Sequence, residues 1–311
     1  MTKKNNLKIK VYLFNILLGF FALPSFYAQQ ESQVTQYTDN ILHYNPAYAG
    51  SRDMMNFTLL HRQQWVGIEG APMTSNFLMH TPIKFKNIGL GFSVLNDRIG
   101  PLNQNWINAD FSYSLRFSND ARLNLGMKGG VSVLNGRISE LFAIDENDVL
   151  LTDNYANELS PNFGFGMFYH TDEFYIGASS PKILDDIYSL PVEALRNQRH
   201  YYLVAGGYIN VNRMLKIRPA GMVKITENAP FAADLSVAAI FYDQFWLGGN
   251  YRFDESAGLF FQLQLSPQLK AGYAFDLSTT SLMLHNFGTH EILLSYDLNF
   301  KEKEIMNPRY F

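Results

Sequence analysis

Histidines, which often act in catalysis and metal binding, are few in this chain and mostly far apart. Seven histidines occur in 311 residues, and none of them forms an HExxH motif or a pair at ligand spacing on one strand. The pair His290 and Glu291 lies in a stretch that alternates apolar and polar residues, so its two side chains are expected on opposite faces of a strand. We therefore expect no metal site.

An acidic stretch, "DENDVLLTD" from Asp145 to Asp153, is the other place where possible ligand oxygens gather. A calcium loop needs a central glycine and a closing glutamate at a fixed distance, and this stretch has neither. A solvated external loop is the better interpretation.

Motifs for catalysis and cofactor binding are also missing. The chain has no cysteine, which excludes a cysteine nucleophile, a thiolate zinc site and a disulfide framework. It contains no GxSxG, no Walker-type loop and no GxGxxG after a parallel-strand pattern. We expect neither an enzyme nor a cofactor, although a site built from Ser, His and Asp of distant strands stays open as an alternative.

The first residues have the order of a secretory signal. Four lysines precede an apolar run from Val11 to Leu23, Pro24 follows, and Ala28 supplies a small residue before a cut. We predict a signal peptide at 1–28, with an uncleaved anchor as the alternative. Its removal takes four positive charges and no acid, so the formal charge moves from -3 to 21 minus 28, or -7. An acidic mature chain does not favour binding to nucleic acid.

Alternation with a period of two organises the rest of the chain. From Ile107 to Phe117 every odd position is apolar and every even position is polar, which predicts a strand with one apolar and one polar face. Fourteen such strands are expected, at 55–62, 73–80, 88–97, 106–117, 122–134, 161–170, 173–180, 200–210, 215–226, 231–242, 244–253, 258–266, 269–276 and 289–300.

The connections between these strands alternate in length. Those after the even-numbered strands are short, such as "SNDA" and "SPQ", while the long ones, 135–160, 181–199 and 277–288, all follow odd-numbered strands. Even strand number, long connections at one end and 15% aromatic residues predict an all-β fold: a transmembrane antiparallel β-barrel at 55–300 with short periplasmic turns. A soluble β-sandwich is the alternative.

The polar faces carry charges of both signs, among them Asp110, Lys128, Arg218, Lys270 and Glu291. Glycines such as Gly89, Gly126 and Gly166 lie at other inward positions. A narrow lumen filled by salt-bridged side chains, with or without an inserted segment, fits this pattern at least as well as an open pore.

Two segments outside the strands have no such alternation. We assign 29–54, with "QYTDNILHYNPAYAG", to a periplasmic N-terminal segment that packs in or under the barrel mouth; Pro46 and Gly50 would set turns, and Tyr44 and Tyr48 would be buried. A periplasmic tail, 301–311, ends in "NPRYF" and could form a compact docking element.

Eight segments together resemble the PorP/SprF-like outer-membrane proteins of the type IX secretion system of Bacteroidota. They include "NPAYAG" at 45–50, "HRQQWVG" at 61–67, "NIGLGFSVLNDRIGP" at 87–101 and the closing "PRYF", and they extend from residue 36 to 311. The candidate partner-binding or structural residues in these motifs are Asn45, Pro46, Tyr48, Gly50, Trp65, Asp97, Pro101, Pro308, Arg309, Tyr310 and Phe311.

The resemblance implies a role in secretion or surface attachment of a cognate secreted cargo protein in gliding and type IX systems. It also implies a location in the cell outer membrane, with membrane lipid and the periplasmic ring of the machinery as partners. External loops, chiefly 63–72, 96–105, 135–160 and 181–199, would hold the cargo. A passive porin or small-solute transporter is the alternative function.

Overall fold

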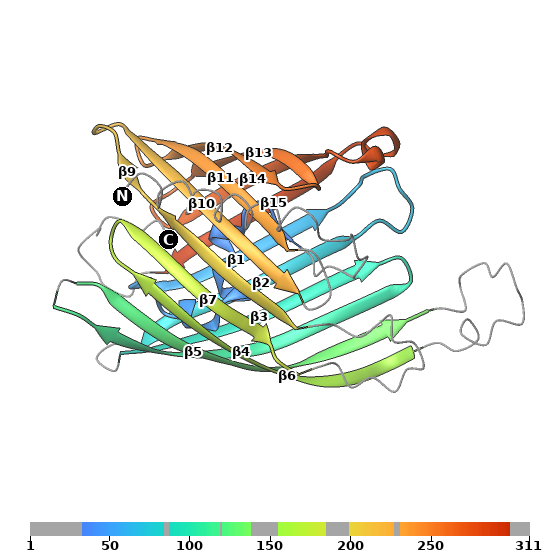
Figure 1. Ribbon diagram of the computed structural model, residues 1–311, viewed down its shortest axis with the longest axis horizontal. Coiled ribbons are helices and arrows are strands. Elements are labelled where there is room, and N and C mark those ends of the chain that lie inside the picture. Colours follow the sequence, from blue (N-terminus) through green and yellow to red (C-terminus); the bar gives the residue numbers. More distant parts are fainter. Residues whose placement is uncertain are drawn as a thin grey trace, which may run out of the picture.

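The protein is a closed antiparallel barrel (Figure 1). The computed structural model describes residues 33–83, 87–118, 120–137, 155–184, 199–226 and 231–298. Within them each strand pairs with the next one along the chain, and the last strand pairs with the first. The strands are β1 (Met55–Gln63), β2 (Met73–Ile83), β3 (Ile88–Ile99), β4 (Leu102–Arg116), β5 (Arg122–Gly136), β6 (Tyr155–His170), β7 (Phe174–Lys182), β8 (His200–Gly207), β9 (Ile209–Asn210), β10 (Leu215–Thr226), β11 (Ala232–Phe241), β12 (Phe245–Arg252), β13 (Ser256–Gln264), β14 (Leu269–Ser278) and β15 (Thr289–Leu298).

Two of these elements share one position in the wall. β8 and β9 both pair with β10 and are separated only by Tyr208, whose backbone N–H donates to the carbonyl of Glu173 at 2.7 Å. The wall formed by the described residues therefore has fourteen positions, and the predicted fourteen-stranded barrel is confirmed.

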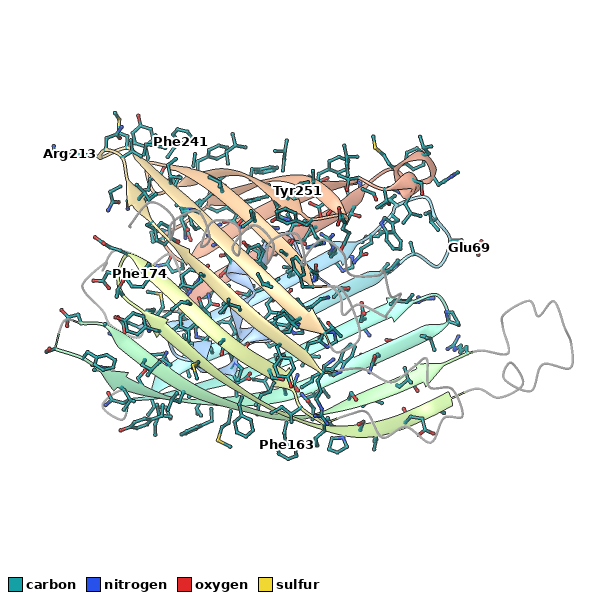
Figure 2. The ribbon with its side chains drawn as sticks, in the orientation of Figure 1. Glu69, Phe163, Phe174, Arg213, Phe241 and Tyr251 are labelled. Carbon is teal, nitrogen blue, oxygen red and sulfur yellow. The ribbon has the colours of Figure 1, made fainter. Side chains whose placement is uncertain are left out.

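The alternation in the sequence becomes an inside and an outside. Along β1, buried residues alternate with residues that are exposed or half-buried, and the outward face of the barrel carries large apolar side chains such as Leu259, which is 69% exposed. Figure 2 shows Phe163 and Phe241 pointing away from the wall. An apolar exterior requires lipid around it, and closure of the sheet leaves no unpaired strand edge in that lipid.

The two ends of the barrel differ. One end carries the connections 84–87, 117–121, 171–173, 211–214, 242–244 and 265–268, and we call it the short-turn end. The other end carries 64–72, 137–154, 183–199 and 279–288, and we call it the long-connection end. Arg213 and Glu69 mark these two ends in Figure 2. In outer-membrane barrels the short turns face the periplasm.

The hairpin of β3 and β4 is longer than the sequence predicted. Ile99 pairs with Leu102, so only Gly100 and Pro101 connect the strands, and the expected external loop 96–105 is mostly strand. The alternation was hidden here because the outward side chains are asparagines: Asn96 donates to Asn103 at 2.6 Å and to Asn105 at 2.8 Å.

Some predicted segments lie outside the described residues. These are the signal peptide at 1–28, the acidic stretch at 145–153, most of the external loops 135–160 and 181–199, the end of the final strand at 299–300 and the tail at 301–311. Among the helices in the described ranges, none has the length and apolar character needed to cross a membrane.

A charge on the lipid-facing wall should destabilise the barrel strongly. Phe261 lies in the middle of β13 with Leu247 and Tyr273 as its cross-strand neighbours, and it points outward. We expect Phe261→Arg to lower the free energy of unfolding by about 2–4 kcal/mol in lipid vesicles. Urea titration measures this change, with Phe261→Leu as the control. Equal stability of the two variants would contradict the assignment of this face to lipid.

Candidate functional site

The interior of the barrel is filled by the segment that precedes β1. Every residue from Gln33 to Ala49 is buried, and the segment folds into three single turns: η1 (Tyr37–Asp39), α2 (Ile41–Tyr44) and η2 (Pro46–Tyr48). Helices this short do not form alone in water, so the contacts with the wall must hold them. We call residues 33–52 the plug (dark blue, inside the ring of strands in Figure 1).

The plug runs from one end of the lumen to the other. Its first part lies at the long-connection end, where Arg252, the last residue of β12, donates to the carbonyl of Val34 at 3.4 Å. Its last part lies at the short-turn end, where Arg52 is 3.2 Å from Asp297 of β15. We predicted 29–54 to be a periplasmic segment that packs in or under the barrel mouth with Tyr44 and Tyr48 buried. Both tyrosines are buried, but the described residues 33–52 extend through the lumen, where the wall offers them buried polar partners at both ends.

Arg62 of β1 anchors the first part of the plug. Its Nη1 donates to Thr35 Oγ1 at 2.9 Å, and it lies 2.8 Å from a carboxylate oxygen of Asp276 and 3.0 Å from one of Glu291. Glu291 also accepts from the backbone N–H groups of Thr35 and Gln36, each at 2.9 Å. Three adjacent strands and the plug thus share one buried ionic cluster.

A second ionic cluster holds the middle of the plug. Asp39 pairs with Lys270 of β14 and accepts from Gln262 of β13 at 2.8 Å, and Arg218 of β10 lies 3.9 Å away. Two cations thus share the Asp39 carboxylate, which is buried. A buried charge is costly unless it is paired, so these ion pairs fix the middle of the plug to the wall.

Removing the charge of Asp39 should loosen the plug. Asp39→Asn leaves Lys270 and Arg218 without their anion and should lower the free energy of unfolding by about 3–5 kcal/mol. We expect protease to cleave the plug faster in this variant than in the wild-type protein. Equal protection of the two proteins would contradict the assignment of Asp39 as an anchor of the plug.

The motif "NPAYAG" contains η2, the last turn of the plug. Asn45 caps η2, since its side-chain oxygen accepts from the N–H of Ala47 at 3.0 Å. Its amide group donates to the carbonyl of Met167 in β6 at 2.9 Å. Pro46 is the first residue of η2, a position where its missing N–H has no cost.

Two glycines of the wall make room for this turn. A Cβ on Gly126 of β5 would overlap the backbone of Ala47, and a Cβ on Gly166 of β6 would overlap the side-chain oxygen of Asn45. Gly126 and Gly166 are directly paired across the two strands, so together they form a flat seat. The plug backbone lies against the wall backbone at this seat.

The end of the motif closes the short-turn end. Tyr48 packs edge-on against His80 and Phe168, with ring centroids 5.2 and 5.4 Å away, and its hydroxyl accepts from Arg52 Nε at 3.3 Å. Gly50 has a φ of +68°, which turns the chain toward β1, and its N–H donates to His80 Nδ1 at 3.3 Å.

The remaining candidate residues lie elsewhere. Trp65 belongs to the connection 64–72 at the long-connection end, with a φ of 45°. Asp97 of β3 accepts from Thr74 Oγ1 at 2.6 Å, and Pro101 lies in the β3–β4 turn. Pro308, Arg309, Tyr310 and Phe311 lie outside the described residues. The structure thus brings Asn45, Pro46, Tyr48 and Gly50 together, and it places Trp65, Asp97 and Pro101 apart from them.

Several plug contacts were not predicted from the sequence. Asp39 and Arg62 were not singled out, although Lys270 and Glu291 were predicted to face the lumen. The alternation in β1 places Arg62 on the inward face, so its position in the lumen could have been predicted from the sequence. His290 and Glu291 face opposite sides as predicted: Glu291 is buried in the lumen, while His290 Nδ1 lies 2.6 Å from the hydroxyl of Tyr273.

A closed barrel with an apolar exterior and a plugged lumen is an outer-membrane β-barrel protein. The chain belongs to the PorP/SprF family: the family model described as "Type IX secretion system membrane protein PorP/SprF" matches residues 26–296. No curated protein sequence matches the chain.

Solved structures similar to this chain are outer-membrane proteins. The Ralstonia pickettii toluene transporter TbuX is 8% identical with a TM-score of 0.51, covering 90% of this chain and 100% of its own. The Acinetobacter baumannii outer membrane protein Omp33 is 8% identical with a TM-score of 0.49, covering 80% of this chain and 100% of its own. At these identities the likeness to TbuX supports the barrel fold alone.

Proposed function

We propose that this protein is a non-enzymatic outer-membrane component of the type IX secretion and gliding machinery that assists secretion or surface attachment of a cognate large secreted protein. Two observations support the proposal: the plug that occupies the lumen, and membership of the PorP/SprF family. A plug that contacts the wall at both ends of the lumen opposes the passage of solutes, so we assign the work of the protein to its surfaces.

The plug also weighs against the alternative, a passive porin or small-solute transporter. Porins with an aqueous channel have wide barrels and unfilled lumens. Here the plug is fixed by two buried ionic clusters, centred on Arg62 and Asp39. Removing one partner from a buried ion pair costs about 3–5 kcal/mol, so spontaneous opening should be rare.

The two ends of the barrel suggest two kinds of partner. The long connections 63–72, 135–160 and 181–199 are the candidate contacts for the secreted cargo on the outside. The short-turn end, with the exit of the plug at Arg52 and the ion pair of Asp53 with Arg122 at 3.1 Å, is the candidate contact for the periplasmic ring. The tail 301–311 would join this second surface.

Deleting the gene tests this proposal against the porin alternative. We expect one or a few large secreted proteins to disappear from the cell surface, as measured by mass spectrometry of peptides shaved from intact cells. Uptake of small solutes should not change. Wild-type protein and Phe261→Leu should restore surface display. Unchanged surface proteins with reduced solute uptake would contradict the proposal and favour the porin.

A further inference from the structure

A hollow interrupts the outward wall of the barrel. It has a volume of about 400 Å³ and lies where β15, β1, β2 and β3 are neighbours. Its apolar lining comes from the outward side chains of Leu59, Phe77, Val94, Ile292 and Leu294. The hollow is thus part of the apolar surface that faces lipid.

A row of polar side chains borders the hollow. His61 pairs across the strands with Ser75, Ser75 with Asn96, and Asn96 with Asn105, and all four occupy outward positions. The next residues across the strands are apolar at both ends of this row. His61 pairs with Ile292 of β15, and Asn105 pairs with Val133 of β5. The polar part of the row therefore coincides with β1 to β4.

These polar groups satisfy each other only in part. His61 Nδ1 lies 2.9 Å from Ser75 Oγ, and Asn96 donates to Asn105 at 2.8 Å. The bond to Ser75 uses only one of the two ring nitrogens of His61, and that side chain is exposed. A polar group in contact with hydrocarbon is costly unless it has a hydrogen-bond partner, so a ligand with its own polar group would be favoured beside His61.

We propose that this hollow binds an acyl chain of an outer-leaflet lipid, with the hydroxyl, ester or amide group of that chain hydrogen-bonded at His61 and Ser75. The occupant is lipid because the hollow is continuous with the lipid-facing belt. The outer leaflet is indicated because His61 is the third residue from the end of β1, at the long-connection end. This site goes beyond the proposed function and does not depend on the plug.

Photo-crosslinking in nanodiscs tests the site. The probe is a phosphatidylethanolamine with a diazirine in one acyl chain, and adducts are located by peptide mass spectrometry. We expect adducts to concentrate on β1, β2 and β3. Ser75→Phe should fill the hollow and reduce them roughly tenfold, which corresponds to about 1.4 kcal/mol. Val94→Phe is a second filling variant with the same expected effect, in case one of the two folds poorly.

The matched control is Ala239→Phe, which places the same ring on the outward face of β11, away from the hollow. It should leave the adducts on β1 to β3 unchanged. Adducts spread evenly around the belt would overturn the proposal. So would adducts that persist in both filling variants, or an absence of lipid adducts from β1 to β3.

Discussion

Removing the plug should open the outer membrane to hydrophilic molecules. In a variant lacking residues 33–51, the charged groups that now bind the plug, including Arg62, Glu291 and Lys270, would line a water-filled lumen. Barrels of 16–18 strands form aqueous channels and those of eight strands are filled by side chains, so fourteen strands without a plug should admit small solutes. We expect permeability to a small hydrophilic antibiotic to rise roughly tenfold or more, measured as the inhibitory concentration for cells that express the variant.

Two controls separate an opened barrel from a misfolded one. Heat-shift electrophoresis establishes that equal amounts of folded barrel reach the membrane. Tyr37→Phe, which removes only the hydroxyl that lies 3.0 Å from Ser236, should leave the membrane closed. A folded deletion variant with wild-type permeability would contradict the role of the plug as the closure.

Blocking the glycine seat should displace the plug without shortening the chain. In Gly126→Leu the new side chain would overlap the backbone of Ala47, and backbone cannot move aside as the tip of a flexible side chain can. Overpacking of this kind costs about 1–3 kcal/mol or more. We expect trypsin to cleave after Arg52, which is buried in the wild-type protein, and N-terminal sequencing of the fragment measures this.

The control for Gly126→Leu is the same substitution at a glycine on the outward face of the wall. Gly249 of β12 lies at an outward position, and a Cβ there would meet neighbouring atoms only at 3.7 Å and beyond. Gly249→Leu should therefore keep Arg52 protected. Equal protection in Gly126→Leu and the wild type would show that the plug does not rest on this seat.

The sequence was sufficient for most of the wall. A period of two is a local signal, and it located β5, predicted at 122–134 and observed at Arg122–Gly136, to within two residues. It failed where both faces are polar, as at Asn103 and Asn105, so β4 was predicted to begin at 106 and begins at Leu102. The alternation is visible only where one face of a strand is apolar and the other is polar. It disappears where the outward face is polar as well.

The plug was harder to predict because its structure is not local. Its turns span only three or four residues each and carry no helical period. They are fixed by partners far away in the sequence, as with Asp39 and Lys270, which are 231 residues apart. The inward glycines were visible in the sequence, but only the structure distinguishes a glycine that seats a plug backbone from one that lines an open pore.

The conductance of the purified wild-type protein in a planar lipid bilayer measures whether the plug closes the lumen. We expect the inserted wild-type barrel to be electrically silent, while the variant lacking residues 33–51 passes a steady current in the same membrane. A steady ohmic current through the wild-type protein would mean that residues 33–52 do not close the lumen.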